Sequence, residues 1–185
     1  MVRHLPVFVL KKPMIETQNL CLTPLMPADA TAIVPLANDI GVTVNLGKLP
    51  HPYTLADAEA FIAHAIGNGA DFAIRLKDGT LIGICGHTLQ GEPHRPELGY
   101  WLGRAHWGKG FGREAVAALT AHTFAVTGAD EVTANVHIGN TASLRILTGL
   151  GFTFYAAETV HSRGLNGPMD IECFSLTRGH WTTAK

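Results

Sequence analysis

The chain has 185 residues, which is enough for one domain with a sizeable hydrophobic core. Apolar residues make up 46% and charged residues 16% of it, a composition that excludes an intrinsically disordered chain. The formal net charge of −1 argues against a nucleic-acid partner, because such proteins usually present a strongly basic surface. The three cysteines are scattered and odd in number, so they indicate neither a disulfide framework nor a metal site.

No targeting signal stands out near the N-terminus. The apolar run at 6–10 is too short for the core of a signal peptide, and no stretch approaches the length of a membrane span. We therefore expect a cytoplasmic protein with no membrane partner. Residues 1–15 are predicted to form an extension, and residues 16–185 a single domain.

The first part of the chain predicts one strand and two helices. Residues 19–25 favour a short strand, and residues 28–38 favour a helix that Pro35 should kink. After a loop, a second helix begins at Thr54, whose spacing from Asp57 is typical of a capping box. The apolar face expected for this helix consists of Phe61, Ile62, Ala65 and Ile66. Gly67 and Gly69 are expected to end the helix.

Three strands follow and lead to a glycine-rich loop. They are expected over 71–77, 80–90 and 97–103. The turns between them are expected at Asp78-Gly79 and around Pro93 and Pro96.

The last part of the chain alternates again between strands and helices. Helical spacing follows the glycine-rich loop, and residues 131–137 then favour a strand. A short helix is expected from Asn140 to Leu150, and an Asn-Gly turn at 166–167 precedes a strand over 170–176. The resulting order, β-α-α-β-β-β-α-β-α-β-β, predicts a mixed α/β fold.

The loop itself, HWGKGFGREA at 106–115, carries the strongest chemical signal. Gly108, Gly110 and Gly112 alternate beside Lys109 and Arg113, directly before the helix. A helix N-terminus offers free N–H groups and about half a positive charge, so cations are unfavourable there unless an anion is present. The segment therefore predicts a seat for a phosphate or pyrophosphate, although a plain turn with cations facing solvent would also explain it.

Two known nucleotide loops fit this segment poorly. A Walker loop requires Lys and then Ser or Thr after its last glycine, but here Arg113 follows Gly112. The dinucleotide fingerprint requires G-x-G-x-x-G early in a βαβ unit, whereas these glycines lie in the middle of the chain as G-x-G-x-G. A phosphate-loop nucleotide binder therefore remains only a weak alternative.

Four segments, in this order and spacing, resemble the GNAT acyl-CoA N-acyltransferases, and specifically the branch similar to ribosomal-protein N-terminal acetyltransferases. They are DATAIVPLAND, LPHPYTLADAEAFI, PELGYWLGRAHWGKGFGREA and NTASLRILTGLGF, and the resemblance covers about residues 16–177. It implies the GNAT fold, with a central mixed, mostly antiparallel sheet flanked by helices and strands splayed at the CoA site. It also implies acetyl-CoA as cosubstrate. The ten histidines form neither an H-E-x-x-H motif nor a carboxylate-backed cluster, so we expect no metal.

The same resemblance implies where coenzyme A binds. Backbone N–H groups from about Lys109 to Arg113 would hold the pyrophosphate, and the backbone of Trp101 to Gly103 would pair with the pantetheine arm. A backbone donor near Leu102 would polarise the thioester carbonyl. Asn140 and Ser143 match the family's Asn-x-x-Ser, while Trp107 replaces the polar residue that usually begins the loop pattern. The implied cofactor-binding residues are Trp101, Leu102, Gly103, Trp107, Gly108, Lys109, Gly110, Phe111, Gly112, Arg113, Asn140 and Ser143.

Acylation of an amine by a thioester requires a deprotonated amine, a polarised carbonyl and a departing thiolate. The pKa of an α-amino group is near 8 and that of a lysine near 10.4, so a general base is useful and typically contributes about 10²–10⁴-fold. Glu97 is our candidate base, since acids at this position serve as base in some family members. A structural or substrate-orienting carboxylate is the alternative for Glu97, and His87, His94 and His106 are lesser candidates.

Two positions depart from the family pattern. Many members carry a Tyr as general acid five residues before the Phe of Gly-Phe, but this chain has Leu147 there. The pKa of the CoA thiol should be near 8.5, so its thiolate is a tolerable leaving group, and Ser143 could orient the sulfur or donate through water. Relatives often place a Glu where this chain has Tyr155.

These residues leave two functions open. The first is transfer of an acetyl group from acetyl-CoA to a primary amine, either a protein N-terminus or a small-molecule amine. The second is a catalytically weak CoA-binding sensor or interaction module, which the two departures would explain. Five aromatic residues could line an acceptor cleft or pack against core and cofactor: Tyr100, Trp101, Trp107, Tyr155 and Trp181. The acceptor and the oligomeric state, a homodimer included, stay open.

Overall fold

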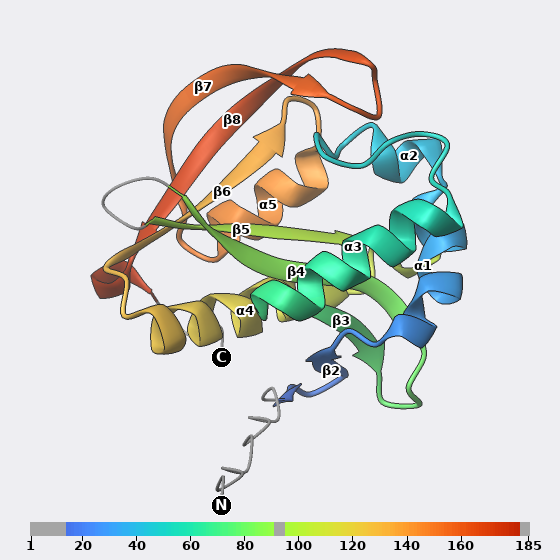
Figure 1. Ribbon diagram of the computed structural model, residues 1–185. Helices are drawn as coiled ribbons and strands as arrows, with labels where there is room; N and C mark the ends of the chain where they lie inside the picture. The colour runs from blue at the N-terminus through green and yellow to red at the C-terminus, as the bar shows by residue number, and fades with distance from the viewer. Residues whose placement is uncertain (1–13, 91–94, 182–185) are drawn as a thin grey trace, which may run out of the picture.

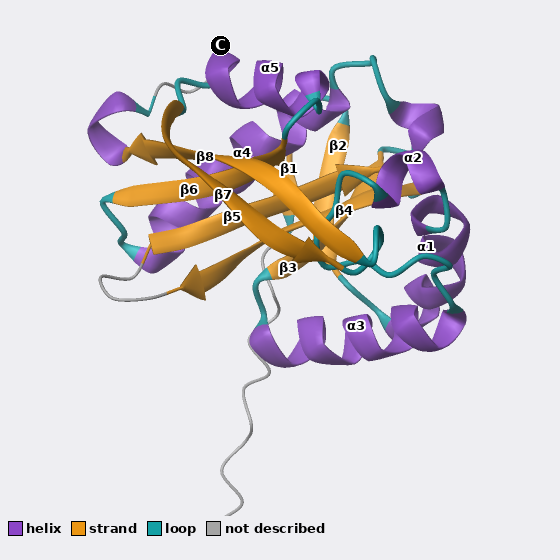
Figure 2. Ribbon diagram, turned by 90° about the horizontal axis from the view of Figure 1, so that it is seen from above, coloured by secondary structure: helices purple, strands orange, loops and turns teal. Residues whose placement is uncertain are grey.

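A sheet of eight strands forms the centre of the molecule, with helices on both of its faces (Figures 1 and 2). The computed structural model describes residues 14–90 and 95–181. The strands lie in the order β1-β2-β3-β4-β5-β6-β8-β7, and every neighbouring pair is antiparallel except the parallel pair β5–β6. This arrangement confirms the predicted mixed α/β class and its mostly antiparallel sheet.

The elements follow the predicted order, with two additions. The strands are β1 Ile15–Glu16, β2 Leu20–Pro24, β3 Asp71–Leu76, β4 Leu81–Gln90, β5 Arg95–Leu102, β6 Glu131–His137, β7 Thr153–Ser162 and β8 Gly167–Thr177. The helices are α1 Ala30–Ala37, α2 Ile40–Thr43, α3 Leu55–Asn68, α4 Phe111–Thr127 and α5 Thr141–Gly149. The predicted order lacked β1, which pairs with β2, and the single-turn helix α2.

The prediction that Pro96 lies in a turn is wrong, because Pro96 lies inside β5 opposite Leu89 of β4. In an antiparallel pair, alternate residues direct their backbone groups to opposite sides of the strand. The N–H of Gly103 donates to Ile82 of β4 (N···O 2.9 Å), so even-numbered residues of β5 face away from β4. The missing N–H of Pro96 therefore costs no hydrogen bond in the β4–β5 ladder. Pro93 lies outside the described residues.

Helix α3 begins and ends at local signals in the sequence. Thr54 Oγ1 accepts from the Asp57 N–H (3.2 Å), and the Asp57 carboxylate accepts from the Thr54 N–H (2.9 Å), which confirms the capping box. Gly69 ends the helix with φ = 75°, a left-handed conformation that favours glycine. Gly67 lies inside the helix instead of ending it. Ile66 is 50% exposed, so the prediction that it belongs to the apolar face is wrong.

Each face of the sheet carries its own hydrophobic cluster. Helices α4 and α5 cover one cluster, which includes Leu98 and Leu102 of β5, and helices α1 and α3 cover the other, against which Trp101 packs (Figure 2). Side chains of β5 therefore alternate between the two faces, as strand geometry requires. Strand β5 thus carries side chains on both sides of the sheet at the centre of the fold.

Strands β5 and β6 separate after a short contact. Only two residue pairs join them, Glu97 with Thr133 and Leu98 with Ala134, although β5 continues to Leu102. The backbone of β5 beyond Leu98 has no partner strand on that side. This separation, which we call the fork, confirms the splayed strands expected from the resemblance.

The first turn of α4 is anchored to the segment between β1 and β2. The carboxylate of Glu114 accepts hydrogen bonds from the hydroxyl of Thr17 (2.6 Å) and from the backbone N–H and side-chain amide of Asn19 (2.6 and 2.9 Å). Burial raises the pKa of Glu114, but these hydrogen bonds outweigh it, so the pKa lies below its ordinary value of 4.5. The acidic side chain also complements the positive end of the helix dipole.

We expect Glu114→Gln to lower the free energy of unfolding at pH 7 by about 1–2 kcal/mol, since it replaces a charged acceptor by an amide in a partly exposed site. Because the folded pKa is depressed, the stabilisation by the carboxylate is complete above pH 4.5 and disappears as the pH falls through the folded pKa. Urea unfolding at pH 7 and at about pH 3.5 measures both effects.

Glu59→Gln is the control, because Glu59 lies exposed on α3 and the same change there should leave stability unaltered. Equal stabilities of the Glu114→Gln variant and the wild type at pH 7 would contradict the anchoring role.

Candidate active site

The loop between β5 and α4 leaves several backbone N–H groups without helical partners. Gly108 and Gly110 have φ of 72° and 83°, conformations that favour glycine, and the space around both Cα atoms is open. Gly110 caps α4 without a side-chain hydrogen bond, and the first helical bond runs from the N–H of Glu114 to Gly110 (3.1 Å). The N–H groups of residues 111–113 therefore have no acceptor within the helix. Such a helix start suits a phosphate group.

The third glycine serves the packing of α4 on α5. A Cβ atom on Gly112 would lie 2.9 Å from Cδ1 of Ile146 on α5. A side chain there would require the terminal methyl group of Ile146 to shift, at the point where the two helices enclose the space next to the loop.

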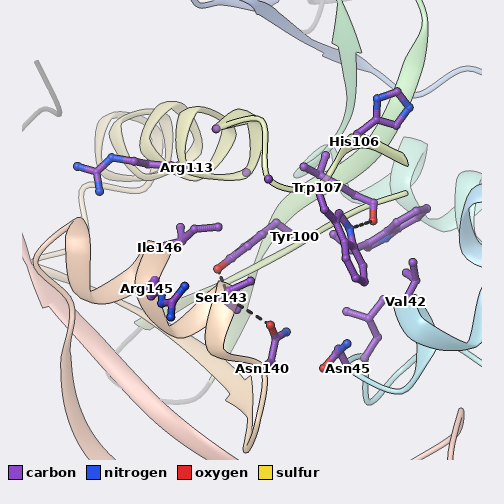
Figure 3. Close-up of a pocket in the computed structure, with 17 residues that line it drawn as sticks. Val42, Asn45, Tyr100, His106, Trp107, Arg113, Asn140, Ser143, Arg145 and Ile146 are labelled. Atoms are coloured by element: carbon purple, nitrogen blue, oxygen red, sulfur yellow. Dashed lines mark hydrogen bonds between the residues drawn. The ribbon is translucent and has the colours of Figure 1, made fainter. Parts of the chain in front are cut away.

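A cavity of about 380 Å³ lies between this loop, β5, α5 and α2 (Figure 3). Most of the residues expected to bind the cofactor line it, namely Trp101, Leu102, Trp107, Gly108, Gly110, Gly112, Arg113, Asn140 and Ser143. Gly103, Lys109 and Phe111 are not among the lining residues, and Phe111 instead packs against the hydrophobic cluster under α4. The cavity thus begins at the α4 N-terminus and reaches the fork.

The edge of β5 in the fork is partly covered by Trp107. Because even-numbered residues of β5 face away from β4, the backbone groups of Tyr100 and Leu102 point toward the fork, while those of Trp101 and Gly103 belong to the β4 ladder. The indole N–H of Trp107 donates to the carbonyl of Leu102 (2.7 Å), in place of a neighbouring strand. The N–H groups of Tyr100 and Leu102 remain directed toward the fork.

Tyr100 and Ser143 meet on the wall of the cavity. The phenol oxygen of Tyr100 lies 2.6 Å from Oγ of Ser143, and Figure 3 shows the two hydroxyls pointing at each other. Burial raises the pKa of Tyr100 to about 12, although the hydrogen bond to Ser143 lowers it in part. The side chain of Asn140 accepts from the Ser143 N–H (3.1 Å), so Asn140 caps α5. Leu147 is fully buried in the core.

The sequence alone predicts for Tyr100 only a place in an acceptor cleft or in aromatic packing. Its period-two position with Leu98 and Leu102 would have placed it on the α4–α5 face of the sheet. The other aromatics divide: Trp181 packs against Phe124 (ring centroids 6.5 Å apart), and Tyr155 lies exposed on β7.

Helix α2 forms a wall of the cavity that the sequence did not reveal. Val42, Asn45 and Leu46 line this side. Arg104, which follows β5, binds the Asp39 carboxylate at the start of α2 (2.7 Å), and the bonds from Arg104 and the Gly41 N–H hold the pKa of Asp39 below its usual value. A helix of four residues carries no periodicity that a sequence pattern could show.

Glu97 lies at the fork rather than on the cavity wall. It shares a sheet face with Trp101, opposite the face of Tyr100. The Asn135 amide donates to its carboxylate (3.1 Å), the ammonium of Lys48 lies 3.8 Å away, and its side chain is 23% exposed. The carboxylate therefore faces solvent-accessible space next to the point where the strands separate.

The histidine candidates are dispersed. His87 lies on β4 with its ring 3.4 Å from the hydroxyl of Thr123, His106 lines the cavity, and His94 lies outside the described residues. Burial, assisted by Lys109, lowers the pKa of His106. Within residues 14–90 and 95–181, no group of three or more His, Cys, Asp or Glu could hold a metal ion. No helix in this part is long and apolar enough to cross a membrane.

Comparisons with known proteins agree with this geometry. The Acetyltransferase (GNAT) domain family matches residues 19–153. The uncharacterized N-acetyltransferase p20 of Bacillus licheniformis is 34% identical over 114 residues, a match that spans 60% of this chain and 64% of that protein.

Solved structures share the fold. A GNAT-family acetyltransferase from Bacillus anthracis superposes with a TM-score of 0.79 at 19% identity, over 89% of this chain and 98% of that one. Two further matches at 19% identity were solved with ligands. Mycobacterium smegmatis RimJ with CoA-disulfide has a TM-score of 0.73 (86% of this chain, 82% of that one), and spermidine N-acetyltransferase from Vibrio cholerae with CoA and spermine has 0.74 (87% and 96%). The chain belongs to the GNAT family of acetyl-CoA-dependent acyltransferases.

Proposed function

We propose that this protein transfers the acetyl group of acetyl-CoA to a primary amine, with Glu97 as general base. The observation that carries the proposal is the continuity of the site: one cavity joins the start of α4 to the fork in the sheet, and Glu97 stands where the fork begins. A donor bound at the loop and an amine arriving from the Glu97 side can meet at this point.

The residues at the loop fit a pyrophosphate. The N–H groups of residues 111–113 supply donors, and Arg113 and Arg145, which are both among the lining residues, supply positive charge. In the fork, the N–H groups of Tyr100 and Leu102 can donate to the amides of the pantetheine arm and to the thioester carbonyl. A donor aimed at that carbonyl would polarise it and stabilise the negative charge that develops on its oxygen.

Glu97 completes the chemistry on the acceptor side. The amine nitrogen forms a bond to the carbonyl carbon, its proton passes to the Glu97 carboxylate directly or through water, and the C–S bond breaks with its electron pair on sulfur. Asn135 and Lys48 hold the carboxylate in place. Because the ammonium form of a lysine or polyamine predominates at pH 7, a base matters more for these acceptors than for an α-amine.

The segments that resemble the ribosomal-protein branch favour a protein N-terminus as acceptor. RimJ and spermidine N-acetyltransferase have this fold and the same sequence identity to this chain, 19%. Since the fold alone does not choose between their acceptors, a small amine is the competing acceptor. A catalytically weak CoA-binding module is the second candidate function. It is favoured by Leu147, which is buried where many relatives have a tyrosine, and by Tyr155 in place of a glutamate.

We expect CoA to bind the wild-type protein and to raise its melting temperature. Arg113→Ala should weaken CoA binding about tenfold, because it removes a charge-assisted contact to phosphate. Isothermal titration calorimetry measures both dissociation constants. Lys77→Ala is the matched control, since Lys77 lies at the β3 end, pairs with Glu16, and is absent from the cavity lining. A wild-type protein that does not bind CoA would refute the proposal.

We expect Glu97→Gln to lower kcat/KM by about 10²–10⁴-fold while the dissociation constant of CoA stays unchanged, since Glu97 lies off the cavity wall. Thiol release with N-terminal peptides, polyamines and aminoglycosides as acceptors provides the assay, and Glu59→Gln is again the control.

The outcomes separate the candidate functions. Turnover by the wild type with no loss in Glu97→Gln would assign Glu97 a structural role and remove the general base. CoA binding without thiol release above the hydrolytic rate for any acceptor would favour the sensor.

A further inference from the structure

The contact between Tyr100 and Ser143 joins two elements that both line the cavity. Tyr100 comes from β5 and Ser143 from the first turn of α5, and their oxygens are 2.6 Å apart. Both residues line the cavity, so the pair is within reach of a bound ligand. The Ser143 N–H is already held by Asn140 (3.1 Å), which fixes the backbone from which the hydroxyl projects.

The chemistry of the two hydroxyls decides which one donates. A phenol, with a pKa near 10, is a stronger hydrogen-bond donor than an aliphatic alcohol. A serine hydroxyl carries one hydrogen and can accept two hydrogen bonds. When Tyr100 donates to Ser143, the hydrogen of Ser143 stays available and can turn into the cavity. Burial that raises the pKa of Tyr100 to about 12 keeps this phenol protonated throughout the neutral range.

We propose that Tyr100 is a positioning residue, whose phenol donates to Ser143 and thereby directs the Ser143 hydroxyl to donate to the sulfur of coenzyme A. The proposal rests on the proposed function and concerns the departure of the thiolate. Many family members have a tyrosine on this helix as the general acid for the thiolate. In this chain Leu147 occupies that position and is fully buried, so α5 supplies no phenol. The structure brings a tyrosine hydroxyl to the same helix from β5 instead.

The step needs no proton from Tyr100. As the bond between nitrogen and the carbonyl carbon forms, the C–S bond breaks and its electron pair remains on sulfur. The Ser143 O–H donates to that negative sulfur, and the Tyr100 O–H donates to the Ser143 oxygen. In a chain of two hydrogen bonds each bond polarises the other, so the second bond strengthens the first.

The test titrates the thiol of CoA bound to the protein, using the ultraviolet absorbance of the thiolate. We expect the pKa of the bound thiol to be about one higher in Tyr100→Phe than in the wild type, a tenfold change in ionisation. Ser143→Ala should show the same rise, and the double variant no more than either single variant. Residues that act as a unit give such non-additive effects.

Two further variants serve as controls. Ser143→Thr keeps a hydroxyl and should restore the pKa of the bound thiol that Ser143→Ala loses. Tyr53→Phe removes a phenol that is likewise buried, with a pKa raised to about 12, but that lies in the cluster under α1 and α3, so it should leave the thiol unchanged.

Steady-state kinetics give a second readout. We expect kcat to fall about tenfold in each single variant and in the double variant, with CoA affinity unchanged within about twofold. A pKa of the bound thiol in Tyr100→Phe equal to that of the wild type would overturn the proposal. The proposal would also be overturned if the losses in kcat of Tyr100→Phe and Ser143→Ala multiplied in the double variant. If CoA binds but no amine is acetylated, the proposed function fails, and the titration still decides the role of Tyr100.

Discussion

The separation of β5 from β6 after two residue pairs is the constraint on which the site depends. An unpaired strand edge inside a sheet leaves N–H and C=O groups without partners, which is costly unless something else satisfies them. Here the Trp107 indole N–H donates a hydrogen bond to the carbonyl of Leu102. The loop that follows β5 therefore folds back and covers part of the edge of β5. This explains why an indole can replace the polar residue that usually begins the loop pattern. Its N–H binds the strand, while the proposed phosphate site consists of backbone N–H groups further along the loop.

The start of α4 shows how a stable helix can leave its N-terminus open to an anion. Glu114 complements the helix dipole, but its carboxylate is bound by Thr17 and Asn19 of the β1–β2 segment. The N–H groups of residues 111–113 are left for a ligand because Gly110 offers no side chain to cap them. Glu114 thus anchors the first turn of the helix, while Gly110 leaves the N–H groups of that turn accessible.

Much of the fold could be predicted from local signals. The capping box at Thr54 and the hairpin turn at Asp78-Gly79 are set by short-range chemistry, and the alternation of glycines marked the loop before α4. Helix α2 could not be predicted, because a single turn has no period and is held by the distant Arg104. The pairing of Tyr100 with Ser143 was also hidden, since it depends on how β5 and α5 approach each other across 43 residues of chain.

The buried Leu147 and the Tyr100 hydroxyl illustrate how packing and polar contacts are divided between α5 and β5. A leucine fills the core beneath α5 without a polar group to satisfy, and such burial is worth about 1.5–3 kcal/mol for a side chain of this size. A hydroxyl at that position would have to reach the cavity or remain unpaired at a cost. Tyr100 avoids this conflict, because its ring packs against the same hydrophobic cluster while its oxygen reaches Ser143 at the cavity wall. If Tyr100 has the role that we propose, the position of its hydroxyl in space compensates for the missing tyrosine in the family's sequence pattern.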